Sequence, residues 1–270
     1  MPTRRWFDFE AFVSCSAKPL DFYDKWTRQY PANYLCIFRT AQGYFSLFEV
    51  TGNQECLDRA LYVTDFALLG QQPWSHPLFR ENVLGGWTAQ NSDYEWSDAR
   101  EVYGAEMLFK AYDHTGNLEY LERAVAAMRA NFKVSPLENW AHNGQTNAPT
   151  GRPKFHWGTG SGAATVEMYA ERFGDAYIHL KRGHGVGVDG CTVRSLSIVR
   201  DDSHDTGAGG SNILVETVID SPFAWQRKAR IVLDGLESGS HCSVTVNGHA
   251  HSVVGDNTGR AQLEFTMTER

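Results

Sequence analysis

An internal repeat is the sequence feature that most restricts the fold of this chain. The segment Thr51–Ala60 (TGNQECLDRA) is matched 64 positions later by Thr115–Ala124 (TGNLEYLERA). In each copy a Thr-Gly-Asn turn separates two segments of helical character, and its glycine supplies the left-handed conformation that ends the first helix. Repeated helical hairpins are typical of solenoids and of closed rings of helices.

The hydrophobic pattern predicts five helices of two alternating kinds. Segments 32–50, 98–114 and 161–173 are apolar around most of their circumference, which predicts inner helices buried on all sides. Segments 54–69 and 118–132 carry one apolar stripe opposite charged residues, which predicts half-exposed outer helices. Because a simple bundle would make every helix amphipathic, the alternation favours one ring of helices inside another.

Two long connectors, at about 71–97 and 133–158, are rich in aromatic and polar residues and join the hairpins. The short Thr-Gly-Asn turns occupy one end of the hairpins. The connectors and the N-terminal segment are therefore expected at the other end, where the inner helices begin. Helix N-termini favour anionic groups, so the sequence predicts one aromatic and polar mouth at that end.

After Gly174 the pattern changes to short stretches of alternating apolar and polar residues, separated by Gly, Asp, Asn and Ser clusters. Alternation at a period of two predicts strands, and Asn247-Gly248 is a signal for a hairpin turn. The expected strands are 177–180, 192–199, 213–219, 229–233, 243–246 and 262–265. We therefore expect an α+β chain of two domains, a helical-hairpin domain at 1–174 and an antiparallel β-sandwich at 175–270.

Composition restricts the classes of partner. The net charge is −7 without a long basic run, which argues against nucleic acid and anionic membranes. Apolar runs stay far below the roughly 20 residues of a membrane span. The N-terminus lacks an apolar h-region, so we expect no signal peptide, and the cytoplasm is favoured although the compartment stays open. The cysteines form no CxxC motif and are expected to be mostly buried thiols without a disulfide framework, metal site or cofactor (Cys15, Cys36, Cys56, Cys191 and Cys242).

The alternating helices, the repeat and the two aromatic connectors, followed by a β region, resemble the six-hairpin (α/α) toroid superfamily of carbohydrate-active enzymes. Glycoside hydrolases, unsaturated-uronide hydrolases and several polysaccharide lyases share this architecture. The resemblance covers about 30–174 for the toroid and 175–270 for the sandwich, rests on architecture instead of a single motif, and implies an oligo- or polysaccharide as partner.

The expected helices are too few for a six-hairpin ring, which leaves two explanations. Either the chain carries the last hairpins of a longer toroid, whose missing N-terminal part is then a further partner, or it forms a reduced, half-open ring. If part of the ring is missing, catalytic residues of the family can be missing with it.

Asp93 and Glu95 in the first connector are the main candidates for catalysis. In an extended segment their side chains point to one side and Tyr94 to the other. Cleavage of a glycosidic bond needs one protonated and one ionised carboxyl group; a separation of roughly 6.5–9.5 Å indicates inversion and one of roughly 5–5.5 Å retention. The alternative is a solvated loop with a salt bridge to Arg100. Hydrolysis by Asp93 and Glu95 is the first hypothesis.

A polysaccharide lyase is the second hypothesis, with Tyr94 and His142 as the reacting pair. Such an enzyme abstracts the C5 proton of a uronide with Tyr or His and neutralises its carboxylate with Asn, His or Arg. These residue types are supplied by Tyr94, Tyr103, Asn139, His142, Arg152 and His156. The alternative for each histidine is a structural hydrogen bond, and no ligand spacing marks a metal site among His76, Asp93, His142 and His156.

A third hypothesis is a non-catalytic glycan-binding or scaffold protein that keeps only the aromatic mouth. Flat rings stack on sugar faces, although core filling between helices is the alternative for each tryptophan. The candidates for substrate binding are Trp74, Trp87, Asn91, Trp96, Arg100, Trp140, Arg152, His156 and Trp157. The histidines after residue 174, among them His179 and His184, are expected on the surface.

Overall fold

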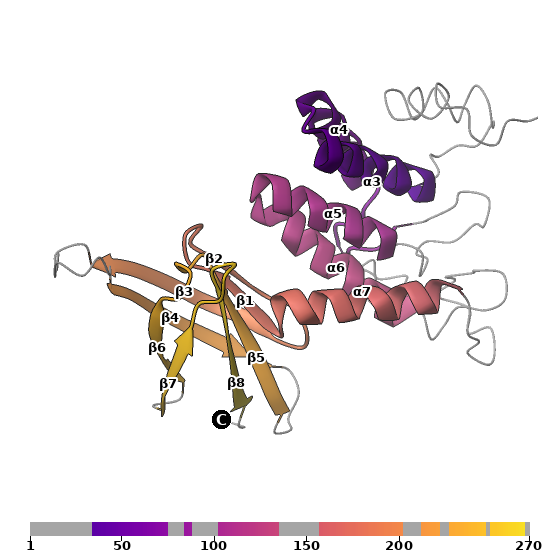
Figure 1. The fold of residues 1–270 in the computed structure, drawn as a ribbon. Coiled ribbons are helices and arrows are strands. Elements are labelled where there is room, and N and C mark those ends of the chain that lie inside the picture. Colours follow the sequence, from indigo (N-terminus) through magenta and orange to yellow (C-terminus); the bar gives the residue numbers. More distant parts are fainter. Residues whose placement is uncertain are drawn as a thin grey trace, which may run out of the picture. The chain divides into compact units, whose positions relative to one another are not determined.

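A computed structural model describes residues 34–74, 84–87, 102–134, 157–201, 212–221, 227–246 and 249–267 of the chain. The chain divides into two compact units, Met1–Val166 and Glu167–Arg270. Helices come first and strands follow, so the chain belongs to the mixed α+β class (Figure 1). The division falls inside the last helix, α7 (Trp157–Phe173), whereas the expected boundary followed residue 174.

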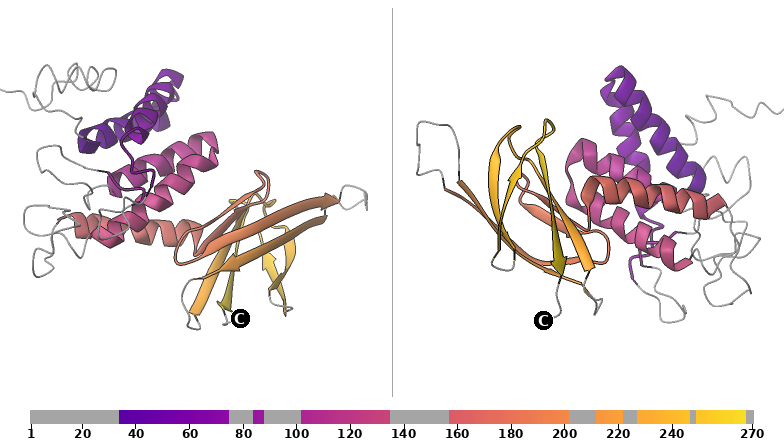
Figure 2. Two further views of the ribbon diagram at one scale, coloured as in Figure 1. Left: turned by 180° about the vertical axis from the view of Figure 1, so that it is seen from behind. Right: turned by 60° about the horizontal axis from the view of Figure 1, so that its bottom comes forward.

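Four helices of the first unit form two hairpins. Helix α3 (Tyr34–Thr51) pairs with α4 (Gln54–Leu68), and α5 (Val102–Thr115) pairs with α6 (Leu118–Val134), as Figure 2 shows from two further sides. The expected helices are confirmed with ends that shift by a few residues, which is the usual uncertainty at helix ends.

The two hairpin turns have the same hydrogen bonds. The Thr51 hydroxyl donates to the carbonyl four residues earlier at 2.6 Å, and the Thr115 hydroxyl does the same at 2.7 Å. Gly52 and Gly116 have φ angles of 68° and 72°, in the left-handed region that only glycine adopts without cost. The repeat in the sequence is therefore a repeat of one turn geometry.

The asparagine of each turn caps the following helix. The Asn53 side-chain oxygen accepts the N–H of Glu55 at 3.0 Å, and that of Asn117 accepts the N–H of Glu119 at 3.1 Å. Each glutamate in turn pairs with the arginine four residues later, at 2.7 Å in α4 and 2.8 Å in α6. The caps satisfy N–H groups that a helix start leaves without an internal partner.

Burial separates the helices into the two expected kinds only in part. Every residue of α5 before Thr115 is buried or half-buried, and α4 and α6 are each buried along one stripe, as predicted. The prediction that α3 and α7 are buried on all sides is wrong. Val50 of α3 is 85% exposed, and Ala163 and Ala164 of α7 are exposed, because an apolar surface is buried only where a neighbouring element covers it.

The described part of the second unit contains eight strands. They are β1 (Ala176–His179), β2 (His184–Gly187), β3 (Thr192–Asp201), β4 (Asn212–Asp220), β5 (Arg227–Asp234), β6 (His241–Val246), β7 (His249–Val254) and β8 (Arg260–Met267). One sheet has the order β2-β1-β5-β8, while β3–β4 and β6–β7 form two-stranded ribbons. The prediction of a purely antiparallel domain is wrong, because β1 and β5 pair in parallel.

The predicted strands are confirmed with small shifts, whereas β2 and β7 were not expected. The last register pair of β6 and β7 is Val246 with His249, the residues on either side of the expected hairpin turn. The turn residues Asn247 and Gly248 themselves lie outside the described residues.

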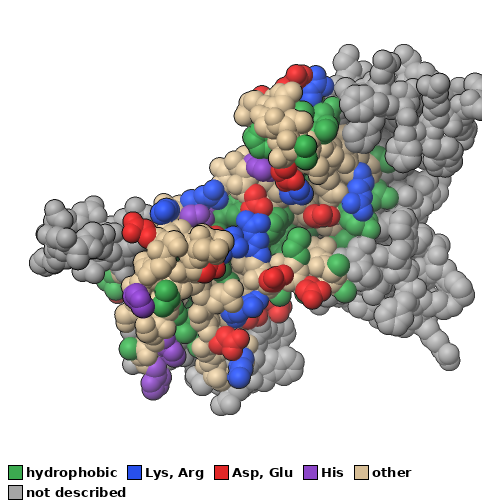
Figure 3. Space-filling model, viewed as in Figure 1, with side chains coloured by type: hydrophobic (Ala, Val, Ile, Leu, Met, Phe, Trp, Pro, Cys, Tyr) green, Lys and Arg blue, Asp and Glu red, His purple; other side chains and the backbone are tan. Residues whose placement is uncertain are grey.

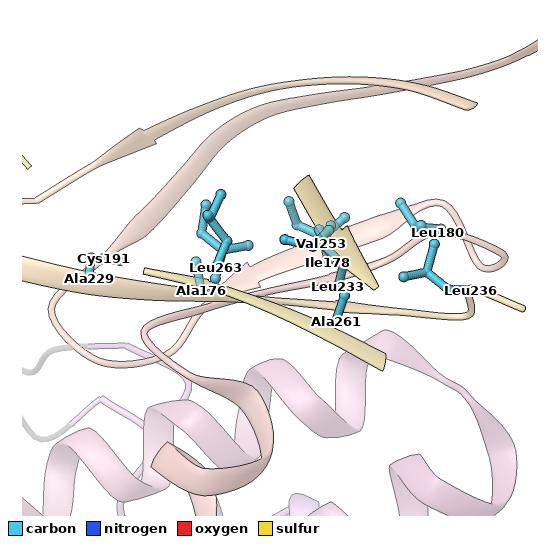
Figure 4. Close-up of a cluster of buried hydrophobic side chains, with 11 residues drawn as sticks. Ala176, Ile178, Leu180, Cys191, Ala229, Leu233, Leu236, Val253, Ala261 and Leu263 are labelled. Atoms are coloured by element: carbon cyan, nitrogen blue, oxygen red, sulfur yellow. The ribbon is translucent and has the colours of Figure 1, made fainter. Parts of the chain in front are cut away.

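The core of the second unit lies on one face of the four-stranded sheet. Alternate residues of β1, β5 and β8 point to it, among them Ile178, Leu233 and Leu263 (Figure 4). Apolar residues of both ribbons pack against the same cluster, for example Leu196 of β3 and Val244 of β6. On the opposite face Tyr177 packs against Phe173 of α7, with ring centroids 4.8 Å apart.

The four cysteines in the described ranges are free thiols. Only Cys191 among them is buried and Cys36 is exposed, so the expectation of mostly buried thiols is wrong for this part of the chain. None of the described helices combines the length and hydropathy that crossing a bilayer requires.

Removal of either cap tests the repeated turn. We expect Asn53→Ala and Asn117→Ala each to lower the free energy of unfolding by about 1 kcal/mol, because both helices lose the same bond. Glu122→Ala, at an exposed position of α6, is the control and should have little effect. Denaturant unfolding measures all three variants. A large loss at one asparagine and none at the other would contradict the equivalence of the two turns.

Candidate functional site

The inner helices α3 and α5 run parallel. The Gln42 side-chain amide, midway along α3, donates to the Tyr103 carbonyl and to the Glu106 carboxylate in the first turns of α5, both at 3.0 Å. Two turns further on, Lys110 of α5 lies 2.7 Å from the Glu49 carboxylate of α3. Sequence order increases along both helices in the same direction, so both helices begin towards one side of the unit and their Thr-Gly-Asn turns lie towards the other.

Segments 69–74 and 84–87, which we call the connector base, are the described ends of the first connector. Backbone bonds join them, from the Gln72 N–H to the Gly86 carbonyl at 2.8 Å and from the Gly85 N–H back to Gln72 at 2.9 Å. The Gln71 side chain donates to the Gly85 carbonyl at 2.8 Å and to the Arg123 carbonyl of α6 at 3.0 Å. The described ends of the connector are therefore fixed to each other and to α6 just after α4 ends.

The conformation and packing of Gly85 explain why the connector base contains a glycine at this position. Its φ angle is 92°, and a Cβ atom placed there would lie 2.5 Å from the Ala126 backbone of α6. Only glycine allows this approach. Gly85-Gly86 is therefore a signal in the sequence for the position where the connector packs on the outer helix, and our sequence reasoning did not use it.

Trp87 is buried among three helices of the first unit. Its side chain is 0% exposed, and its indole N–H donates to the Ala67 carbonyl at the end of α4 at 2.8 Å. Its ring meets Phe38 of α3 edge-on with centroids 5.0 Å apart, and a Cβ on Gly104 of α5 would lie 2.7 Å from it. Trp87 thus joins three helices and has no exposed ring face for a sugar, so its proposed role in substrate binding is replaced by core filling.

Trp74 has the opposite environment. It ends the described part of the connector base and is 55% exposed. Its indole is thus partly exposed, unlike the fully buried indole of Trp87. Among the binding candidates it is the one whose described side chain lies on the surface.

Tyr103 and Arg39 form the described polar surface at the starts of the inner helices. The Arg39 guanidinium lies over the Tyr103 ring at 3.9 Å and donates to Gln42 at 2.9 Å. Such a cation–π contact holds the Arg39 side chain against the Tyr103 ring. One ring face of Tyr103, a residue type that a lyase would need, is thus covered by Arg39.

The remaining candidates lie outside the described residues, except that Trp157 is the first residue of α7 and only its backbone is described. These candidates are Asn91, Asp93, Tyr94, Glu95, Trp96, Arg100, Trp140, His142, Arg152 and His156, together with His76 and Asn139. Of the first connector, the structure describes the connector base, where it is attached to the helices.

Comparisons of the chain with models of protein families, with curated proteins and with solved structures found no match. The function is therefore argued from the residues and the geometry of the chain itself.

Paired substitutions at the two tryptophans test their assignments. Burial of an indole contributes about 4–6 kcal/mol at most, so Trp87→Ala should cost about 3–5 kcal/mol of stability. Trp87→Phe keeps most of the ring and should cost about 1 kcal/mol through the lost hydrogen bond. Trp74→Ala should change stability by less than about 0.5 kcal/mol. Thermal or denaturant unfolding that ranks Trp74→Ala as the most damaging change would refute this assignment.

Proposed function

We propose that the chain is a carbohydrate-active protein, and specifically a glycoside hydrolase, that binds an oligo- or polysaccharide at the end of its helical unit where the connectors attach. The observation that carries this proposal is the parallel packing of α3 and α5 with the repeated turns at the far end. This packing supports a common mouth for the connectors, and the first connector contains Asp93 and Glu95.

The chemistry follows from the two carboxyl groups. In the proposed reaction one of them protonates the oxygen of the leaving sugar, while the other activates water or attacks the anomeric carbon. The acid must hold its proton at neutral pH, which burial or a neighbouring negative charge achieves by raising its pKa. The exposed ring of Trp74 at the connector base is the proposed stacking platform beside this pair.

The architecture that we propose is a partial (α/α) toroid followed by a β-sandwich. Two hairpins with one turn geometry support the toroid, as does an inner helix, α5, that is buried or half-buried as far as His114. In the second unit, two ribbons pack their apolar residues on one face of the four-stranded sheet, which supports a two-layer sandwich.

Asp93→Asn and Glu95→Gln test the hydrolase assignment. Each should reduce the release of reducing sugar from a cleaved glycan by about 10²–10⁴-fold while folding is unchanged, because general acid–base catalysis contributes about that much. The measurement is a reducing-sugar assay over a panel of neutral and acidic polysaccharides. Glu122→Gln on the exposed face of α6 is the matched control and should keep full activity.

The other hypotheses predict different results in the same assay. A rise in the ultraviolet absorbance of an unsaturated uronide, abolished by Tyr94→Phe, would replace the hydrolase by a lyase. Binding of glycans without turnover, unchanged by Asp93→Asn and Glu95→Gln, would replace it by a non-catalytic glycan-binding protein. The absence of both binding and turnover across the panel would reject a carbohydrate function.

A further inference from the structure

A row of four polar residues crosses the four-stranded sheet of the second unit at one end. His184 of β2 is the register partner of His179 of β1, which is the partner of Asp234 of β5, which in turn is the partner of Arg260 of β8. The neighbouring residue Ile178 belongs to the apolar core. Since side chains alternate along a strand, this histidine row lies on the face opposite the core.

The acidic member of the histidine row is already bonded twice. The Tyr177 hydroxyl donates to the Asp234 carboxylate at 2.9 Å, and Arg260 Nε donates to the same oxygen at 3.1 Å. Asp234 is therefore fixed in place by two donors, one of which carries a positive charge.

The two imidazoles lie against each other. Their ring centroids are 5.7 Å apart in an edge-to-face arrangement, and both side chains are half-buried, which corrects the expectation that they are surface residues. His179 also packs on Gly235, where a Cβ atom would lie 3.0 Å from its ring. The Arg182 backbone N–H points to His179 Nδ1 at 3.4 Å, which leaves Nε2 as the protonated nitrogen of the neutral ring.

The surroundings of His184 oppose a positive charge on its ring. Burial is the main cause that lowers its pKa, to about 4, and the neighbouring His179 and Arg182 lower it further. His184 is therefore neutral at neutral pH.

The surroundings of His179 also lower its pKa. Burial lowers its pKa first, Asp234 acts in the opposite direction, and Arg182, Lys181 and Arg260 lower it further. Figure 3 shows blue basic and purple histidine side chains close together near the β1–β2 turn. Three basic side chains thus act on His179 against one carboxylate, on a chain whose net charge is −7.

We propose that the histidine row, together with Lys181 and Arg182 of the β1–β2 turn, binds an oxyanion, namely the carboxylate, sulfate or phosphate group of a small molecule or of an acidic saccharide. Charge disfavours a cation, because Lys181 and two arginines act on His179, Arg182 acts on His184 as well, and the one carboxylate of the row already accepts from Tyr177 and Arg260. The described residues also contain no group of three His, Cys, Asp or Glu side chains suited to a metal ion.

A bound oxyanion would supply a hydrogen-bond acceptor and a negative charge next to the imidazole pair. His179 Nε2–H and the two basic side chains of the turn donate hydrogen bonds to it. Its negative charge then stabilises the imidazolium forms, so binding takes up protons. The affinity therefore rises as the pH falls from neutrality towards the pKa values of the free histidines. The proposal does not depend on the glycan mouth of the helical unit, since it concerns binding alone.

The test follows the imidazole resonances of the isotope-labelled full chain by NMR as the pH is changed. Titrations in phosphate, in sulfate and in glucuronate are each compared with chloride at equal ionic strength, and neutral glucose serves as a further control. We expect at least one of these anions to raise the pKa of both His179 and His184 by about one unit relative to chloride. The anion that acts identifies the source of the oxyanion.

Charge-matched variants separate the site from general electrostatics. Lys181→Ala combined with Arg182→Ala should remove most of the shift, whereas Lys228→Ala combined with Arg129→Ala removes the same charge at exposed positions elsewhere and should retain it. Equal titrations in all four salts, or equal shifts in the two double variants, would overturn the proposal. The comparison of salts on the unmodified chain decides the question even if a variant folds poorly.

Discussion

The parallel alignment of α3 and α5 is the arrangement on which the helical unit depends. Two helices that are adjacent in space and equal in direction need a third helix to return the chain, and α4 provides that return after the Thr51–Asn53 turn. The same turn recurs before α6. Because the short turns use one end of each hairpin, every long connection must use the other. The position of the candidate mouth is thus a consequence of chain direction.

Packing energy fixes that arrangement more strongly than any single polar bond. The buried indole of Trp87 contacts α3, approaches Gly104 of α5 and is bonded to the last turn of α4. Its burial outweighs the roughly 1 kcal/mol of a hydrogen bond such as that from Gln42 to Tyr103. Trp87, which the sequence offered as a candidate for sugar binding, therefore anchors the connector base to the helices instead.

Local rules explain what could be predicted from the sequence. The glycine and asparagine of each turn act on neighbouring residues, so the hairpins and their ends followed directly from TGN. The outer helices followed from a single apolar stripe. Both predictions needed no knowledge of distant contacts, and both are confirmed in the described part of the chain.

The remaining features depend on partners that are far apart in sequence. The parallel pairing of β1 with β5 joins residues 55 positions apart, and the histidine row exists only because of the register of four strands. Strand β2 (HGVG) contains two glycines and carries little strand signal of its own; pairing with β1 makes it a strand. Likewise the apolar pattern of α3 could not reveal that Val50 has no covering neighbour.

A distance measurement tests the common mouth most directly. Spin labels would be placed at Glu95 and His142, one in each connector, and at Glu95 and Glu55, with the native cysteines replaced. The account predicts that the first pair is closer than the second, which should be separated by at least about 20 Å, the length of α4 from Glu55 to its end at about 1.5 Å per residue. The reverse order would place the connectors at opposite ends of the helices and contradict the account.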